Sequence, residues 1–167
     1  MSTITTTNPA TGETIKTYPL MSEQEATAKL EAAQAAFEKW RTLPHADRAP
    51  YLTKIAQKLR DNADDLAALM TQETGKLLKD GKREVEICAA IFDYTAKTGP
   101  GALADEERTH GPNGSRGVVS YQPLGVIYSI QPWNFPLYQP VRVLAANLMT
   151  GNACVLKHAS ICTGTGL

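Results

Sequence analysis

The sequence predicts an α/β fold in which helices pack on an incomplete parallel sheet. Two observations carry this prediction: a strand, a helix and a second strand follow one another between residues 125 and 157, and four amphipathic helical patterns precede them. The span is close to the roughly 30 residues that a βαβ unit needs, and its strands should pair in parallel through a right-handed crossover. Because two parallel strands alone leave both faces bare, we expect the front part of a larger α/β fold.

The N-terminal residues predict two short strands joined by a turn. Residues 4–8 and 14–18 contain Thr and Ile, which favour strands, and Pro9 and Gly12 lie between them. Pro and Gly favour turns because of their restricted and permissive backbones.

Three amphipathic helices are predicted next. Ser22 and Glu25 form a capping-box pattern, after which apolar residues recur at alternating steps of four and three. Asp47 is a candidate N-cap for the second helix, and Asn62 is one for the third, which ends near residue 75. The second and third should be surface helices with one buried stripe.

The remaining elements alternate in the order that a parallel sheet needs. A fourth helix carries Val85, Cys88, Ala89, Phe92 and Ala96 on one face, and the Gly and Pro residues at 99–101 form a stop signal. Residues 99–116 then predict a long exposed connection. Strand-like segments follow at 118–121, 126–130 and 153–156, with a helix over 135–149 between the last two.

Composition excludes several classes of protein. Lys and Arg together number 17, as do Asp and Glu, so no net field favours nucleic acid or an anionic membrane surface. No apolar stretch approaches the roughly 18 to 20 residues that cross a bilayer, and the first ten residues lack the features of a secretion signal. We therefore expect a cytoplasmic protein without nucleic-acid or membrane partners.

The three cysteines predict neither disulfides nor a metal site. Cys88, Cys154 and Cys162 are odd in number, lack CxxC spacing and have no nearby His pair. Core packing is the expected role of Cys88 and Cys154, whereas Cys162 lies in a polar, Gly-rich tail.

Two side chains at the end of the strand 126–130 can carry chemistry. Asn134 can be a helix N-cap, and it can also present its amide donors to an oxyanion; these roles are compatible. Trp133, between two prolines, can cover the core or form a wall for a flat ligand. Both should lie at the carboxyl edge of the sheet, where open α/β sheets bind ligands.

Two cations complete the candidate site. Lys157 ends the second strand at the same edge, where it can be a solvated lysine or can reach a phosphate or ribose hydroxyl. Arg142 follows Asn134 by a little over two helical turns on a largely apolar helix. A guanidinium there needs a counter-ion, which can be a structural carboxylate or a ligand carboxylate.

Five segments, in order along the whole chain, resemble the aldehyde dehydrogenase superfamily. They are NPATG at 8–12, ETGK at 73–76, YQPLGV at 121–126, PWNFP at 132–136 and GNACVLK at 151–157. The resemblance implies NAD(P)-dependent oxidation of a small-molecule aldehyde to an acid, with the helices packed on an incomplete Rossmann-like sheet. An unrelated α/β protein with a chance PWNFP is a weaker alternative.

The resemblance also implies roles for single residues. It makes Asn134 the catalytic oxyanion donor and a cofactor contact, and the other cofactor contacts are Ile130, Pro132, Trp133, Lys157 and Ser160. Arg142 matches the arginine with which succinate-semialdehyde dehydrogenases hold the distal carboxylate of the substrate, and Phe135 matches a residue of the substrate tunnel.

Departures from the family pattern refine these expectations. Most members have Pro after the lysine, and often Glu three residues after it, whereas this chain has His158 and Ser160. A Glu repels a ribose 2′-phosphate and a Ser does not, so NADP is as plausible a cofactor as NAD.

The resemblance implies a division of the chain and a state of activity. Residues 1–116 would form N-terminal strands and a helical layer, 117–124 would belong to an oligomerisation sheet, and 125–167 would begin the NAD(P)-binding domain. The family's nucleophilic cysteine and general-base glutamate match no residue here, so the chain alone is expected to be catalytically silent. The full-length form would be a homo-oligomer; alternatively, the chain is a non-catalytic oligomerisation or binding module.

Overall fold

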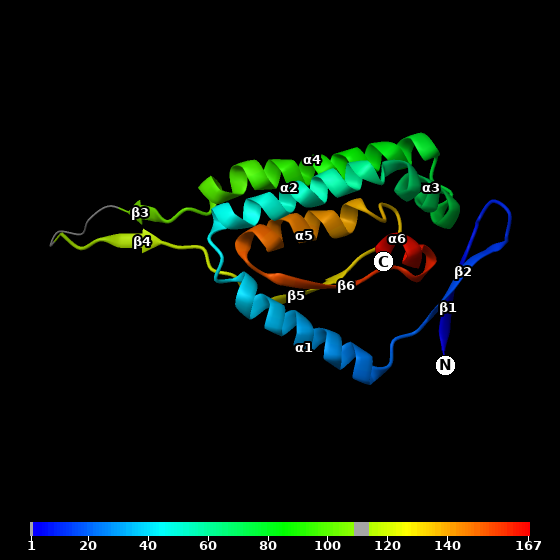
Figure 1. Cartoon of the computed structure of the whole chain (residues 1–167), viewed down its shortest axis with the longest axis horizontal. Helices are drawn as coiled ribbons and strands as arrows, with labels where there is room; N and C mark the ends of the chain where they lie inside the picture. The colour runs from blue at the N-terminus through cyan, green and yellow to red at the C-terminus, as the bar shows by residue number, and fades with distance from the viewer. Residues whose placement is uncertain (1, 109–113) are drawn as a thin grey trace.

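The computed structural model describes residues 2–108 and 114–167 and has a layered α/β architecture (Figure 1). In chain order its elements are β1 (Thr3–Thr7), β2 (Thr14–Pro19), α1 (Glu23–Trp40), α2 (His45–Asp61), α3 (Ala63–Thr74), α4 (Leu78–Ala102), β3 (Glu106–Arg108), β4 (Gly117–Val119), β5 (Val126–Ile130), α5 (Tyr138–Thr150), β6 (Ala153–Lys157), the 3-10 turn η1 (Ser160–Cys162) and α6 (Thr163–Gly166). Among the described residues, no helix is both long enough and apolar enough to cross a bilayer.

The strands pair as three separate two-stranded sheets. Strands β5 and β6 are parallel, with Val126 opposite Ala153 and Ile130 opposite Lys157, as the predicted βαβ unit requires. Figure 1 shows this pair between α1 on one side and α5 on the other, with α2 and α4 beyond α5. The β1–β2 and β3–β4 pairs are antiparallel and lie at opposite ends of the molecule.

The hydrophobic core lies mainly between α2, α4 and α5. Its buried members are Leu52, Ala56, Met70, Val85, Cys88, Ala89, Phe92, Ala96, Leu137, Val141, Ala145 and Met149. These are the apolar stripes that the helical periodicity predicts, and the burial of Cys88 confirms its expected packing role. The core therefore holds α5, and with it the segment that leads into α5, against α4.

Helix α4 ends at Ala102, one residue after the predicted stop at residues 99–101, and Gly99 and Pro100 lie within its last turn. A Cβ on Gly99 would lie 2.5 Å from Cγ of Met149, so this glycine lets α4 approach α5 closely instead of ending the helix. The expected exposed connection is also partly ordered, since β3 pairs with β4, which is shorter than the predicted strand. Residues 109–113 of that connection lie outside the described residues.

The predicted starts of α2 and α5 and the predicted side-chain cap of α3 differ from the structure as well. Helix α2 begins at His45 after Pro44, so Asp47 lies in its first turn and is not its N-cap. Asn62 does precede α3, but its amide donates to the carbonyl of Lys58 and does not cap α3. Helix α5 begins at Tyr138, three residues after the predicted start.

Candidate active site

The parallel pairing brings the predicted cofactor residues to one edge of the sheet. Ile130 and Lys157 are opposite each other at the carboxyl ends of β5 and β6, and the backbone N–H of Gln131 donates to the carbonyl of Lys157 at 3.0 Å. Ile130 is 65% exposed and Lys157 is also exposed. Pro132 follows on the surface, and Ser160 is exposed at the start of η1. The edge is therefore open to a ligand.

The PWNFP segment forms the turn between β5 and α5. Trp133 is 58% exposed, so it does not cover the core, and Asn134 and Phe135 are exposed beside it. The N-cap prediction for Asn134 is wrong, because Leu137 holds that position and makes no side-chain capping bond. The amide of Asn134 is thus not committed to the N-terminus of α5.

A pocket of about 810 Å³ opens beside this turn. Trp133, Asn134 and Phe135 line it from the turn, Tyr138 from α5, and Lys76 from the connection before α4. Further lining residues come from the end of α3, the same connection and α4: Thr74, Gly75, Leu77, Asp80, Arg83, Glu84 and Ile87. The wall beside Asn134 is aromatic, and the α4 side carries the aliphatic and charged groups.

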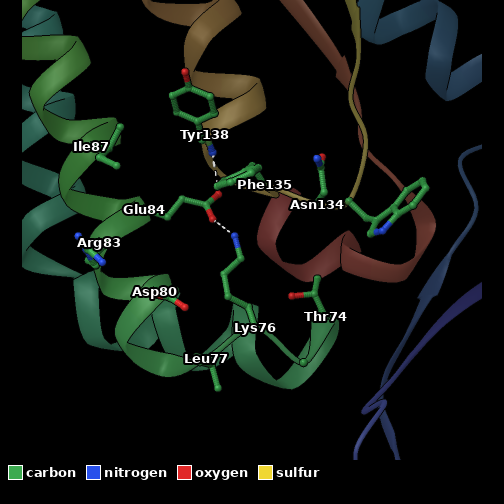
Figure 2. A pocket seen from close by; sticks show the side chains of 12 residues that line it. Thr74, Lys76, Leu77, Asp80, Arg83, Glu84, Ile87, Asn134, Phe135 and Tyr138 are labelled. Atoms are coloured by element: carbon green, nitrogen blue, oxygen red, sulfur yellow. Dashed lines mark hydrogen bonds and ion pairs between the residues drawn. The ribbon is translucent and has the colours of Figure 1, made fainter.

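A buried ion pair forms one wall of this pocket. The side chains of Lys76 and Glu84 are 15% and 2% exposed and pair directly (Figure 2). Oε1 of Glu84 also accepts hydrogen bonds from the backbone N–H groups of Leu137 and Tyr138, each at 2.9 Å. Glu84 therefore caps α5 from α4. No local sequence pattern indicates a role for either residue, because a capping pattern needs a partner within the same helix.

His158 holds the same turn from the other side. Its Nε2 lies 2.6 Å from the carbonyl oxygen of Pro136, and its Nδ1 lies 2.7 Å from the backbone N–H of Ala159. The carbonyl needs a donor and the N–H needs an acceptor, so the neutral ring with a proton on Nε2 satisfies both. The departure from the family pattern at this position thus has a structural role.

Arg142 lies apart from the pocket. It is exposed one turn further along α5, with its guanidinium carbon 5.5 Å from the centre of the Tyr138 ring, and Tyr138 in turn lines the pocket. Among the described residues no carboxylate pairs with Arg142, so the structural salt bridge that it could have formed is not observed.

The three thiols are poorly suited to nucleophilic attack. Burial raises the pKa of Cys88 to about 12 and that of both Cys154 and Cys162 to about 11. Because the thiolate is the nucleophilic form, hardly any of it exists at neutral pH. Cys162 is fully buried, and its Sγ lies 3.2 Å from Nδ1 of His158.

The chain is similar in sequence to proteins named as succinate-semialdehyde dehydrogenases [NADP(+)]. The chain is 41% identical to a succinate-semialdehyde dehydrogenase [NADP(+)] of Deinococcus radiodurans over 97% of its own length and 34% of that protein. It is 45% identical to a probable succinate-semialdehyde dehydrogenase [NADP(+)] of Synechocystis sp., over 94% of this chain and 34% of that protein. The chain thus spans about a third of the length of these relatives.

Solved structures show the same fold. The succinic semialdehyde dehydrogenase of Streptococcus pyogenes, in complex with NADP+, superposes with a TM-score of 0.90 at 37% identity, over 97% of this chain and 35% of that one. An aldehyde dehydrogenase of Brucella melitensis biovar abortus 2308 superposes with a TM-score of 0.93 at 32% identity, over 99% and 34%. The model of the aldehyde dehydrogenase family matches residues 1–167, and the chain belongs to that family.

Proposed function

We propose that this chain supplies one part of an NADP-dependent succinate-semialdehyde dehydrogenase, which oxidises the aldehyde to the carboxylic acid. The observation that carries the proposal is the position of Asn134, at the edge of the β5–β6 pair and on the wall of the pocket. The similarity to the succinate-semialdehyde dehydrogenases [NADP(+)] of Deinococcus radiodurans and, as a probable one, of Synechocystis sp. supports the substrate and the cofactor.

In this proposal the substrate lies in the pocket with its aldehyde beside Asn134, and its distal carboxylate reaches past Tyr138 to Arg142 outside the pocket. The Nδ2 donors of Asn134 stabilise the oxyanion that forms when a nucleophile attacks the aldehyde carbon, and such a donor acts mainly in the transition state. Phe135 packs against one side of the substrate. Arg142 binds the distal carboxylate, for which its planar guanidinium offers two parallel donors. Its lack of a carboxylate partner among the described residues supports this role.

The exposed edge of the sheet fits a dinucleotide. Ile130, Pro132 and Trp133 offer an apolar surface to a flat ring, and Lys157 offers a cation to a ribose hydroxyl or phosphate. Ser160 is exposed nearby and adds no negative charge, which suits a 2′-phosphate; NAD is the alternative cofactor. The bound cofactor supplies the acceptor for the hydride, and Asn134 lies at the boundary between its site and the aldehyde.

In this proposal residues 1–116 form the N-terminal strands and a helical layer. Residues 117–124 belong to an oligomerisation segment, and residues 125–167 begin the cofactor domain. We also propose that the chain alone turns over no aldehyde, and the raised pKa values of all three thiols support this. The test is to mix the purified chain with succinate semialdehyde and NADP and to follow reduced nicotinamide. Sustained turnover would refute the silent state.

A chimera tests the activity itself. Replacing the matching third of the Deinococcus radiodurans enzyme with this chain should give an active NADP-dependent dehydrogenase. In that chimera Arg142→Leu should raise KM for succinate semialdehyde about 100-fold, the loss of one charge-assisted bidentate contact, and change KM for an uncharged aldehyde little. Equal effects on both aldehydes would rule out the carboxylate role, and an inactive but folded chimera would rule out the proposed activity.

The second candidate function is a non-catalytic oligomerisation module. The β3–β4 ribbon favours it, because it projects from the helices at one end of the molecule and exposes Val118 and Val119 (Figure 1). A homo-oligomer through this ribbon predicts that light scattering finds a dimer or larger species, which Val118→Lys disrupts. A monomer at all concentrations would contradict the module.

A further inference from the structure

Glu84 is placed to control the geometry of the PWNFP turn as well as the stability of α5. Its side chain is 2% exposed and uses both carboxylate oxygens: Oε1 accepts from the N–H groups of Leu137 and Tyr138, and Oε2 pairs with Lys76. Leu137, at the N-cap, has no side-chain acceptor of its own. Without Glu84 the first N–H groups of α5 would be unsatisfied, and one of them is buried.

Four contacts, one to each of residues 135–138, hold the turn that carries Asn134. Glu84 binds the backbone at residues 137 and 138, and His158 binds the carbonyl of Pro136. Nζ of Lys76 lies 4.3 Å from the centre of the Phe135 ring, so the same ion pair also contacts the residue next to Asn134 (Figure 2). The side chain of Asn134 itself lines the pocket, beside this fixed backbone.

Lys76 offsets the cost of burying the carboxylate of Glu84. An isolated buried carboxylate would be strongly destabilised, whereas this one pairs with a cation and accepts two backbone N–H bonds. The charged form binds the N-terminus of α5 more strongly than a neutral group, because it also interacts with the helix dipole.

We propose that Glu84, paired with Lys76, is a positioning residue that holds Asn134 in the orientation that an oxyanion donor needs. The inference deepens the proposed function and rests on it for its catalytic consequence. The positioning itself is a property of this chain, and it is tested without turnover.

The first experiment compares Glu84→Gln with Glu84→Ala in the 167-residue chain. Loss of the acceptor in Glu84→Ala should speed amide exchange at Leu137 and Tyr138 about 10- to 100-fold and shift the side-chain NH2 resonances of Asn134. Glu84→Gln keeps an acceptor oxygen and should restore most of the protection. If Glu84→Ala does not fold, the double variant Lys76→Met/Glu84→Leu, which removes the acceptor and leaves no unpaired cation, takes its place: unchanged Asn134 resonances in that variant would overturn the proposal.

Glu73→Ala is the matched control. Glu73 is equally buried and also accepts backbone N–H bonds, but at Gly164 and Thr165, away from the turn. It should leave the Asn134 resonances unchanged. The same shift in both variants would mean that Glu84 acts only through general stability, which overturns the positioning role.

The second experiment measures kinetics in the active chimera. Glu84→Ala should lower kcat about 100-fold, the effect of a misplaced transition-state donor, with KM for NADP within about twofold of wild type. Glu84→Gln should recover most of kcat. A rise in KM with unchanged kcat would contradict positioning of Asn134, whereas an inactive wild-type chimera would count against the proposed function and leave the exchange result standing.

Discussion

Two buried glutamates cap helices that belong to other parts of the chain, and they differ in what balances their charge. Glu84 accepts the first N–H groups of α5 and pairs with Lys76. Glu73 accepts the N–H groups of Gly164 and Thr165 in α6 and the hydroxyl of Thr165, at 2.8 to 2.9 Å. Within residues 2–108 and 114–167, Glu73 thus has neutral donors alone, whereas Glu84 has a cation.

The comparison shows at which helix N-terminus an ion pair, and not only neutral hydrogen bonds, holds the capping carboxylate. Neither N-cap residue, Leu137 or Cys162, makes a side-chain capping bond, so both helices depend on a carboxylate from α3 or α4. Only Glu84 contacts the turn that carries Asn134. The Lys76–Glu84 pair therefore links the stability of the helical layer to the geometry of the site, and Glu73 serves as its reference.

The largest expected effect comes from breaking the ion pair on one side. Glu84→Leu should lower the free energy of unfolding by about 3 to 5 kcal/mol, because it leaves Lys76 without its partner in a largely buried place. Urea unfolding measures this value. The double variant Lys76→Met/Glu84→Leu should recover part of the loss, and a loss below about 1 kcal/mol in the single variant would contradict the role of the pair.

Removing the reference carboxylate should cost less. Glu73→Ala should lower the free energy of unfolding by about 1 to 3 kcal/mol, since it leaves neutral donors unsatisfied but no unpaired charge. Amide exchange at Gly164 and Thr165 should rise most. A loss equal to that of Glu84→Leu would mean that the cation of Lys76 does not change the free energy of unfolding. It would contradict the difference between the two glutamates.

The two carboxylates also differ in which thiol pKa they raise. Burial, and secondarily Glu84, raises the pKa of Cys88 to about 12; burial, and secondarily Glu73 and then Glu84, raises that of Cys162 to about 11. Glu84→Gln should therefore lower the pKa of Cys88, and Glu73→Gln that of Cys162. Each shift should be below about one unit, or 1.4 kcal/mol. Thiolate absorbance against pH measures both.

The same values give a direction for stability against pH. The folded state raises these pKa values above the 9.0 of a free thiol, so the thiols stabilise the fold fully below about pH 9. That contribution should be lost as pH rises through about 11 to 12. Cys88→Ala should flatten the alkaline loss, and an unchanged pH profile would contradict the burial of this thiol.

Local features of the fold could be predicted from sequence, and contacts between distant segments could not. The capping box is confirmed: Ser22 Oγ accepts from the N–H of Glu25, and the Glu25 carboxylate accepts from the N–H of Ser22. Both partners lie within one helical turn. Glu84 and Leu137 are 53 residues apart, so no local pattern could show that this glutamate caps α5.

The difference between local patterns and contacts of distant segments also explains the wrong prediction of the α5 N-cap and the misread role of Gly99. Asn134 was expected to cap a helix because it precedes an apolar stretch with Pro136, but Glu84 already supplies the cap and α5 begins later. Gly99 and Pro100 resemble a helix end, although the close approach to Met149 is the reason for the glycine. The roles of Ile130, Lys157, Ser160 and Arg142 toward ligands stay predictions.

A double-mutant cycle between Glu84 and Asn134 tests directly whether Glu84 acts on catalysis through Asn134. In the active chimera, Glu84→Ala should lower kcat about 100-fold when Asn134 is present. In an Asn134→Ala background it should lower kcat by less than about threefold, because the group that Glu84 positions is gone. An equal fall in kcat in both backgrounds would show that Glu84 does not act through Asn134 and would contradict the account.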